Sequence, residues 1–510
     1  MGLSLSHILC YARHLKSIPL IDFKELSPVA CALFSAGAVL LFGAVVTATY
    51  RYFFHPLSLI PGPLLARITR LWLIRVDLSG AGSRKLLMLH RKYGPVVRIG
   101  PNEVSFDGLS AYSDIYSQKA RFLKEDRWYY GIAPKESVNM FTITDNDVHS
   151  VLRRTFSHAF SRSNILTFIP MISEHVDLAM KQVSRYIEKG KPIPIRNLAA
   201  SYTLDTISKL SFGDTMEALA RSELDHPLIK VIETLTNGAE VILRIHIPLT
   251  WKLASNNLGE FSKLIEQVVR SVRQADVSDK LSLVKEAKRR MKDSKDGISE
   301  QMMVSIASQF VIAGLGTTAA SISGILYHVM SNQTVYHRAK EELKAIWPEK
   351  DKHPSLEQLE SLSYFEACIK EGVRTVCPAP VRMPRVVGSE GYQFEKYYIP
   401  EGTVISSSNF FRCYDESVFP DPYRYQPERW LSGDLSQMNA SWLPFAKGSR
   451  ACIGQHMAMI EIKLFVSRFI RYFDVVEFVD ELKLHERLVA EIANELRVRV
   501  RETDEVTEAQ

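Results

Sequence analysis

One uncharged segment limits the folds open to this chain more than any other feature. Pro28 to Tyr50, PVACALFSAGAVLLFGAVVTATY, contains no charged side chain. A helix of that length rises about 1.5 Å per residue and so crosses the roughly 30 Å hydrocarbon layer of a bilayer. The segment begins too far from Met1 for a signal peptide, and no small-residue cleavage site follows it. We therefore expect residues 28–50 to form a retained transmembrane anchor, whose orientation the balanced flanking charges leave open.

The rest of the chain divides into a hinge, one large domain and a tail. An N-terminal segment, residues 1–27, precedes the anchor. Pro56, Pro61 and Pro63 predict a stiff, non-helical hinge over residues 51–63. No second linker interrupts residues 64–500, so we expect a single domain there, followed by a polar tail at residues 501–510. The net charge of +6 is a mild excess that does not indicate a nucleic-acid partner.

Helical patterns dominate the large domain. Gln301 to His337 carry no Lys, Arg, Asp or Glu, and apolar residues recur at spacings of three and four from Met303 to Gly314. Serines and threonines make this stretch too polar for lipid, so we expect a long helix through the core of a mainly α domain. The segment YGPVVRIGPNEVSF from Tyr93 alternates β-forming residues between glycines and prolines and predicts a two-stranded ribbon.

The cysteine pattern indicates one special thiol rather than a disulfide framework. The six cysteines contain no CxxC pair and are Cys10, Cys31, Cys368, Cys377, Cys413 and Cys452. Cys452 lies in FAKGSRACIG, residues 445–454, directly before a segment with helical spacing. The helix N-terminus and Arg450 are expected to lower the pKa of its thiol, and the flanking glycines leave room for a flat group. These features suit a thiolate bound to haem iron.

The same segment resembles the haem-binding signature of the cytochrome P450 family. The matching positions are Phe445, Gly448, Arg450, Cys452 and Gly454. The resemblance implies haem b (heme b, iron protoporphyrin IX) with Cys452 as the axial ligand of the iron. It also implies the P450 fold, a mainly α, helix-rich triangular prism with a small β-rich region, here preceded by one N-terminal transmembrane helix.

Two further motifs follow the order of the same family. KEGVR contains Glu371 and Arg374, three residues apart and so neighbours on one helical face. PERW contains Arg429 and is similar to the family's PERF-like segment. The resemblance implies that these three side chains form a buried network in which two guanidiniums lower the pKa of one carboxyl group. Removal of Glu371 would then leave two buried cations without a partner.

Family resemblance also implies which residues contact the haem and the oxygen. The expected partners of the two haem propionates are His149, Arg153, Arg385 and Arg450. AGLGTT, residues 313–318, looks like the oxygen-binding segment, in which Gly314, Thr317 and Thr318 are the expected catalytic residues. Gly314 would leave room for dioxygen, and Thr317 would help to deliver protons. The family commonly has an acid directly before this threonine, whereas this chain has Gly316.

The function implied by the resemblance is monooxygenation of an apolar secondary metabolite. The chain is similar to microsomal fungal enzymes such as the trichothecene hydroxylases, which suggests hydroxylation or epoxidation of a terpenoid, polyketide or alkaloid. Dioxygen and electrons from NADPH would be used, with NADPH-cytochrome P450 reductase, and in some cases cytochrome b5, as the redox partner. The expected location is the endoplasmic reticulum membrane, with the catalytic domain in the cytoplasm.

Two other functions remain open at this stage. Because Gly316 removes the usual acid, the enzyme could catalyse a rearrangement, a dehydration or an oxidative coupling without net oxygen insertion. A haem-binding electron carrier or sensor is the second alternative, although a carrier needs no Gly/Thr-rich helix over the iron. A reductase is expected to meet Lys447, Arg424 and Lys463. The expected substrate contacts are residues 128–130, Phe310, Ala313 and Val381.

Overall fold

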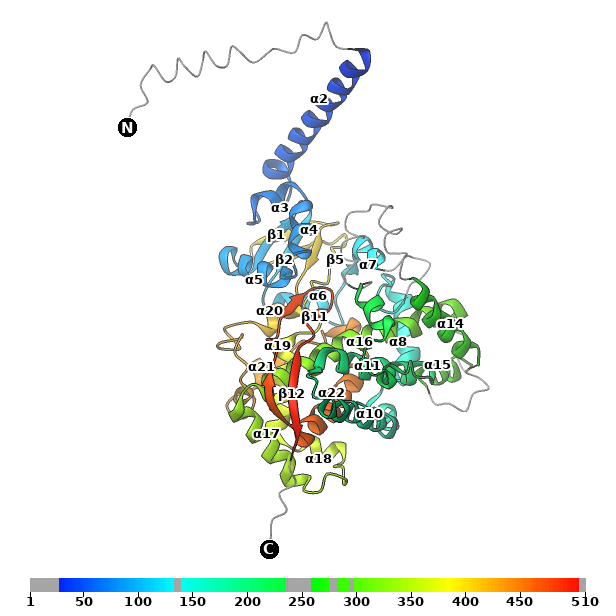
Figure 1. Ribbon diagram of the computed structural model, residues 1–510. Coiled ribbons are helices and arrows are strands. Elements are labelled where there is room, and N and C mark those ends of the chain that lie inside the picture. The colour runs from blue at the N-terminus through cyan, green and yellow to red at the C-terminus, as the bar shows by residue number, and fades with distance from the viewer. Residues whose placement is uncertain are drawn as a thin grey trace.

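The structure is a computed structural model that describes residues 27–132, 139–234, 236, 258–274, 282–292 and 298–503. Helix α2, Pro28–Thr49, projects from the body of the molecule (Figure 1). The side chain of Ser27 caps it by accepting a hydrogen bond from the backbone N–H of Ala30. The most apolar window within Pro28–Phe54 has a mean hydropathy of 2.4, and none of that window is buried against the protein. These properties are compatible with the expected membrane anchor.

The anchor helix continues further than its sequence pattern suggests. A π-helical turn, η1 (Tyr50–Phe54), extends α2 into the predicted hinge. The prediction of a non-helical hinge was therefore wrong for residues 51–54, because no proline interrupts them. The helix ends at Phe54, and His55, the residue before Pro56, has extended backbone because the proline ring disfavours helical backbone there. Residues 55–63 contain no helix or strand.

A long central helix organises the core. Helix α16 (Glu300–Met330) packs along α11 (Ile195–Phe212) and also contacts α19 (Ser363–Val376) and α22 (Gln455–Tyr472). Ser299 caps its N-terminus. Although α16 is long and apolar enough to cross a membrane, 67% of its most apolar window is buried in the protein. The structure confirms the prediction of a core helix rather than a second membrane span.

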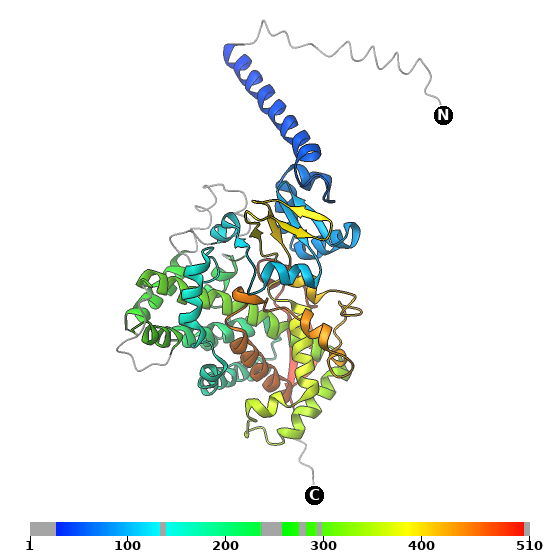
Figure 2. The ribbon, with the colours of Figure 1, turned by 180° about the vertical axis from the view of Figure 1, so that it is seen from behind.

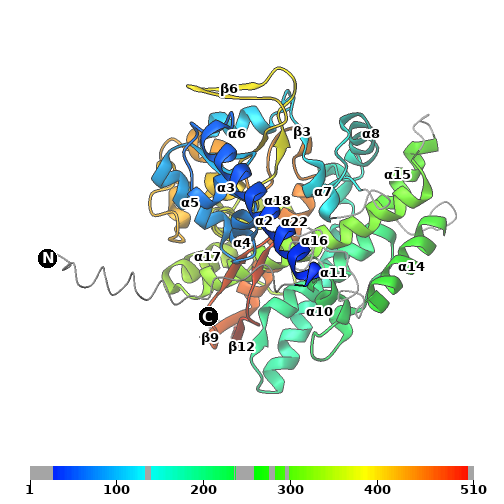
Figure 3. The same cartoon turned by 90° about the horizontal axis from the view of Figure 1, so that it is seen from above.

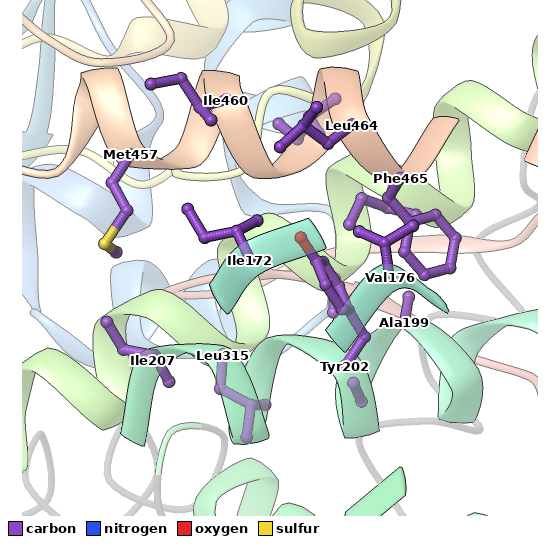
Figure 4. Packing of buried hydrophobic residues seen from close by; sticks show 14 of the residues in the cluster. Ile172, Val176, Ala199, Tyr202, Ile207, Leu315, Met457, Ile460, Leu464 and Phe465 are labelled. Carbon is purple, nitrogen blue, oxygen red and sulfur yellow. The ribbon is translucent and has the colours of Figure 1, made fainter. Parts of the chain in front are cut away.

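The other core helices bury their apolar faces in the same cluster. Side chains of α22 meet those of α10 (Ile169–Glu188) and α11 around Tyr202 and Phe465 (Figure 4). This packing fixes the position of α22, the helix that follows the cysteine segment. The cluster thereby holds the two elements on which the expected site residues lie, α16 and the segment before α22.

Four small sheets accompany the helices. The largest has the strand order β1-β2-β8-β5-β3 and consists of Val96–Gly100, Glu103–Phe106, Val404–Ser406, Arg385–Val386 and Leu123–Lys124. The antiparallel β1–β2 pair confirms the predicted ribbon. The remaining sheets are β4-β12-β9 (Ile193–Pro194, Arg497–Glu502, Phe473–Phe478), β10-β11 (Leu484–Glu486, Ala490–Ile492) and β6-β7 (Tyr392–Phe394, Tyr397–Ile399).

The remaining helices surround this core. They are α3 (Leu64–Ile68), α4 (Leu71–Asp77), α5 (Gly82–Tyr93), α6 (Leu109–Tyr116), α7 (Asp126–Ile132), α8 (Asn146–Ser157), α9 (Arg162–Leu166), α14 (Leu258–Gln274), α15 (Leu283–Lys292), α17 (Gln333–Ile346), α18 (Leu356–Glu360), α20 (Asn409–Cys413) and α21 (Ser436–Ser441). Short 3-10 turns are η3 (Ala218–Ala220), η5 (Pro427–Trp430) and η6 (Gly448–Arg450).

The two views from other sides show how the body is arranged. The anchor leaves the end of the body that contains the largest sheet (Figure 2). Seen from above, α14 and α15 lie at the edge opposite α5 and α6 (Figure 3).

The predicted mainly α fold with a small β-rich region is confirmed. Strand β12 extends to Glu502, so the predicted tail loses its first two residues to a strand, and residues 504–510 lie outside the described chain.

Candidate active site

The cysteine segment is a tight loop that crosses between α21 and α22. The backbone N–H of Cys452 donates a hydrogen bond to the carbonyl oxygen of Phe445 over 2.9 Å, which closes the loop. Gly448 has φ +79°, and a Cβ atom there would lie 1.9 Å from the carbonyl oxygen of Tyr116 on α6. Both the left-handed backbone and the close approach require glycine at this position. The loop is therefore fixed against α6 just before the thiol.

Cys452 differs from the other described cysteines. It is exposed, whereas Cys368, Cys377 and Cys413 are buried. Surrounding protein still shields it from bulk water, and this burial raises the pKa of its thiol. A backbone hydrogen bond from Gly454 and the charge of Arg153 both lower the pKa of the thiol, but they do not outweigh burial. The side chain thus faces a recess inside the protein rather than the outer surface.

The predicted lowering of the Cys452 pKa was wrong for the protein alone. Helix α22 begins only at Gln455, three residues after the thiol, so the N-terminal end of the helix does not prevail over desolvation. The cation that acts on the thiol is Arg153 rather than Arg450. A thiolate at this position needs a further positive charge nearby. A bound metal ion supplies that charge, and a thiol that coordinates it loses its proton.

Helix α16 offers one exposed face within the otherwise buried core. Ala313 is exposed, although the helix around it is largely buried. Thr317, one turn further on, is partly exposed, and its hydroxyl donates a hydrogen bond of 2.8 Å to the carbonyl oxygen of Ala313. An exposed alanine in the middle of a core helix indicates that this face borders an internal space. Thr317 borders the same space through its hydroxyl-bearing side.

Two other predicted catalytic residues lie elsewhere on α16. A Cβ atom at Gly314 would lie 2.8 Å from Cγ1 of Ile207, so this glycine permits close packing of α16 against α11. Gly314 is itself partly exposed, so its role of leaving room for dioxygen stays a prediction. Thr318 is 2% exposed and belongs to the buried side of the helix. Of the three, Gly314 and Thr317 are partly exposed and Thr318 is buried.

Five basic side chains gather near the thiol from four separate parts of the chain. This basic cluster consists of Lys124, His149, Arg153, Arg385 and Arg450. Burial and the charges of its neighbours lower the pKa of His149 to about 3 and that of Arg450 to about 10. Burial, Arg450 and Arg385 likewise hold the pKa of Lys124 well below its ordinary value. His149 is therefore neutral at physiological pH, and the positive charge of the cluster lies chiefly on the guanidinium groups of Arg153, Arg385 and Arg450.

Hydrogen bonds hold the basic cluster in place without neutralising it. Arg153 donates to the carbonyl oxygen of Ala451 over 2.7 Å, and Arg385 donates to the hydroxyl of Tyr129 over 2.7 Å. Arg450 donates to the carbonyl oxygen of Ile143 over 3.0 Å. Within the described part of the chain, the hydrogen bonds of the five side chains go to uncharged acceptors. Buried cations of this kind need an anionic partner.

Lys124 was missed by the sequence analysis, and Tyr129 was predicted only as a substrate contact. Lys124 belongs to no motif, and the signal is in the strand pairing, since the β3–β5 register sets Lys124 directly opposite Arg385. A sequence without a known register does not reveal that neighbour. The other four members of the cluster were predicted, and the structure brings them together with Lys124.

The predicted network around Glu371 is present, and the side chains of Glu371 and Arg374 in it are fully buried. The carboxylate of Glu371 accepts two hydrogen bonds from Arg374, at 2.8 and 2.9 Å, and one from Arg429 at 3.0 Å. The indole N–H of Trp430 and the backbone N–H of Gln426 donate to the same carboxylate. Burial alone would raise the pKa of Glu371, but these hydrogen bonds and the two guanidinium charges lower it overall. The network joins α19 to η5.

The expected substrate contacts separate into two groups. Trp128, Tyr129 and Val381 form one small apolar cluster with the partly buried Phe141 and Leu488. Phe310 instead packs its ring against Phe156 and Phe160, with centroids 5.3 and 4.9 Å away, and belongs to the main core. The first group remains a candidate wall of the substrate space, whereas Phe310 is chiefly a packing residue.

One residue of the expected reductase surface is not on the surface. Lys463 is 6% exposed and forms ion pairs with Glu360 and Glu366, at 3.0 and 2.8 Å. The prediction that it meets a reductase was therefore wrong, because α22 turns this side chain toward two acidic partners. Arg424 and Lys447 are exposed. These two remain candidates for the docking surface.

The residues present fit a haem on two independent observations. The exposed thiol of Cys452 and the exposed Ala313 indicate that the cysteine loop and α16 border an internal space. The basic cluster lies close to Cys452, since Arg153 acts electrostatically on the thiol and also on His149. A flat group with an iron centre and two carboxylates matches both the thiol and the unpartnered cations.

Comparison with known proteins agrees with this geometry. A family model described as Cytochrome P450 matches residues 61–495. Cytochrome P450 monooxygenase BipB of Cochliobolus sativus is 29% identical over 464 residues, which cover 86% of this chain and 89% of BipB. Cytochrome P450 monooxygenase macH of Penicillium terrestre is 28% identical over 482 residues, covering 88% and 92%. Cytochrome P450 monooxygenase aba2 of Botryotinia fuckeliana is 28% identical over 483 residues, covering 90% of each chain. This chain therefore belongs to the cytochrome P450 family and is a haem-dependent monooxygenase.

Proposed function

We propose that the enzyme hydroxylates or epoxidises an apolar secondary metabolite, with dioxygen as oxidant and electrons from NADPH through a reductase. The observation that carries this proposal is the exposed Cys452 on one side of an internal space, with Ala313 and Thr317 of α16 exposed on another. An electron carrier needs no hydroxyl-bearing helix at its metal site. The alternative of a carrier or sensor is therefore disfavoured.

The proposed roles of the residues follow from their chemistry. Bound haem supplies oxygen-activating chemistry, to which a cysteine thiolate contributes electron density. Cys452 would ligate the iron through its sulfur. Lys124, His149, Arg153, Arg385 and Arg450 would neutralise the propionates by hydrogen bonds and charge. The hydroxyl of Thr317 would hold a proton at Oγ1, and its hydrogen bond to the carbonyl oxygen of Ala313 orients it.

The apolar substrate and the membrane location are parts of the same proposal. The cluster of Trp128, Tyr129 and Val381, with Phe141 and Leu488, offers aromatic and aliphatic contacts and few polar groups. The exposed apolar helix α2 supports an anchor in the endoplasmic reticulum membrane, with the catalytic domain in the cytoplasm. An apolar substrate dissolved in the bilayer would be concentrated beside an enzyme anchored there.

Product analysis under isotopically labelled dioxygen tests the proposal. The full-length enzyme in microsomes, with NADPH and NADPH-cytochrome P450 reductase, would be given a panel of terpenoids, polyketides and alkaloids. A product that carries one labelled oxygen atom is expected. A product without label would overturn monooxygenation in favour of rearrangement, dehydration or coupling. Haem reduction without any product across the panel would favour the carrier or sensor.

A further inference from the structure

Two buried cysteines meet at the ends of two helices. Cys377 directly follows α19, and Cys413 is the last residue of α20. Both are 0% exposed and belong to one apolar cluster with Phe410 and Phe411. A hydrogen bond joins the two thiols. The fold therefore holds two sulfur atoms in direct contact and shields them from solvent.

The surroundings of this pair stabilise negative charge on Cys413. Its sulfur accepts hydrogen bonds from the thiol of Cys377 and from the backbone N–H of Leu443. These bonds and the nearby charges of Arg374 and Arg412 lower the pKa of the Cys413 thiol, although burial opposes them. The hydrogen bond between the thiols, together with burial, raises the pKa of the Cys377 thiol. Cys413 is therefore the sulfur that more readily becomes a nucleophilic thiolate.

Packing alone is the competing explanation for the pair, since buried cysteines often serve as small apolar residues. It does not account for the backbone of Cys377, which is left-handed with φ 45° and ψ 71°. Glycine is the usual residue in this conformation at the end of a helix, because a Cβ atom makes the conformation costly. Packing also does not require two hydrogen-bond donors and two cations around one thiol. Both features favour a chemical role for the two sulfurs.

We propose that Cys377 and Cys413 form a redox pair that hydrogen peroxide converts into an intramolecular disulfide. The Cys413 thiolate attacks one peroxide oxygen, which breaks the O–O bond, forms a sulfenic acid and releases hydroxide. The Cys377 thiol gives up its proton as its sulfur displaces the hydroxyl group of the sulfenic acid and forms the S–S bond. Two thiols and one peroxide yield one disulfide and two water molecules. Each sulfur loses one electron, and the peroxide takes up both.

The pair is bonded to two elements near the proposed haem site. Arg374, part of the network that joins α19 to η5, donates a hydrogen bond of 2.7 Å to the carbonyl oxygen of Cys413. Leu443 precedes the cysteine loop, and its carbonyl oxygen accepts a hydrogen bond of 3.0 Å from the backbone N–H of Ala446. A disulfide would close residues 377–413 into a covalent loop and so resist unfolding. In a reducing compartment such a bond would be transient, which suits a response to an oxidant.

Peptide mapping of the full-length, haem-loaded enzyme tests the inference without any variant. The reduced enzyme would be treated with hydrogen peroxide at doses that preserve its carbon monoxide spectrum, unfolded in N-ethylmaleimide and digested with trypsin without reductant. Trypsin gives one peptide for each cysteine of the pair, residues 375–382 and 413–424. We expect these peptides to be linked, two hydrogen atoms lighter than their sum, and to separate on reduction. Cys368, a buried cysteine within α19, is the internal control and should carry maleimide.

Two results of the mapping would overturn the inference. The first is maleimide on both Cys377 and Cys413 with no linked peptide. The second is a linked peptide found only in protein that has lost the carbon monoxide spectrum, because the thiols would then react only after unfolding. Absence of a thiolate-type spectrum in untreated wild type would instead overturn the proposed function.

Two variants test the order in which the sulfurs react. Cys377→Ser leaves Cys413 without a partner, so its sulfenic acid should persist and be trapped by dimedone. In Cys413→Ser, dimedone should label Cys377 about tenfold less or weaker still. Equal labelling would overturn Cys413 as the attacking thiol. In urea unfolding, peroxide should raise the midpoint of wild type but not that of Cys377→Ser, and an unchanged wild-type midpoint would contradict the expected stabilisation.

Discussion

The replacement Glu371→Gln is the most informative perturbation of the fold. It keeps the shape of the side chain but removes the negative charge that faces Arg374 and Arg429. The wild-type carboxylate accepts five hydrogen bonds, from Arg374 (two), Gln426, Arg429 and Trp430. An amide has only one oxygen, and its NH₂ group would point at donors. The variant therefore loses both charge and acceptors.

The expected cost follows from the burial of the partners. The side chains of Arg374 and Arg429 are 0% and 6% exposed, so neither can be hydrated in place of the lost carboxylate. Removal of one partner from a buried ion pair costs about 3–5 kcal/mol. Globular domains are stable by about 5–15 kcal/mol, so the variant would lose roughly a fifth of its stability or more. Less haem-loaded protein should accumulate as a result.

Urea unfolding of the detergent-solubilised full-length enzyme measures this cost. A matched control is Glu390→Gln, which removes the carboxylate of an exposed ion pair with Arg121, the two side chains being 71% and 77% exposed. Such a pair contributes about 0–1 kcal/mol. A Glu371→Gln midpoint that coincides with that of Glu390→Gln would refute the reasoning. Since the pKa of Glu371 is lowered, the stability that it provides should persist at neutral pH and be lost only as the pH falls through that lowered value.

Three further outcomes are expected. Lys124→Met should release haem about tenfold faster in a transfer assay to apomyoglobin, because a charge-assisted hydrogen bond is lost; an unchanged release rate would remove Lys124 from the site. Gly448→Ala should cost about 1–3 kcal/mol or more and lower haem loading, since its Cβ would lie 1.9 Å from the Tyr116 carbonyl oxygen; wild-type loading would contradict this. Burial raises the pKa of Glu461 to about 8, so the folded chain keeps a proton that the unfolded chain releases and stability falls as pH rises from about 4.5 to 8. The free energy of unfolding of Glu461→Gln should therefore rise by about 2 kcal/mol relative to that of wild type as the pH goes from about 5.5 to 7, as measured by urea unfolding. A difference between the two proteins that does not change with pH would count against a buried neutral carboxyl group.

The sequence predicts structure best where the residue types and their spacing along the chain indicate the same arrangement. Glu371 and Arg374 are three residues apart on a helix, so their side chains meet on one helical face. The structure contains the expected hydrogen bonds from the guanidinium group to the carboxylate. The long uncharged segment at residues 301–337 was correctly assigned to the core because its serines and threonines exclude lipid. The membrane-type composition of Pro28 to Tyr50 likewise predicted a helix, which the structure extends to Phe54.

The sequence could not show where tertiary packing reverses a local expectation. Lys463 looks like a surface residue of an amphipathic helix, but two carboxylates from other elements bury it. Gly314 looks only like an opening for oxygen, but its missing side chain also admits Ile207 from α11. The thiol of Cys452 lies close to the start of α22, but burial raises its pKa by more than the surrounding groups lower it. In each case the decisive neighbour comes from a distant part of the chain.

The reduced carbon monoxide difference spectrum tests the central claim most directly, because it reports which protein atom ligates the haem iron. Full-length wild-type enzyme and Cys452→Ser would be expressed with ample haem precursor and compared at equal haem content. Wild type is predicted to give the absorption band of thiolate-ligated haem, and Cys452→Ser to give none. A thiolate-type band in Cys452→Ser, or its absence from haem-loaded wild type, would contradict the account.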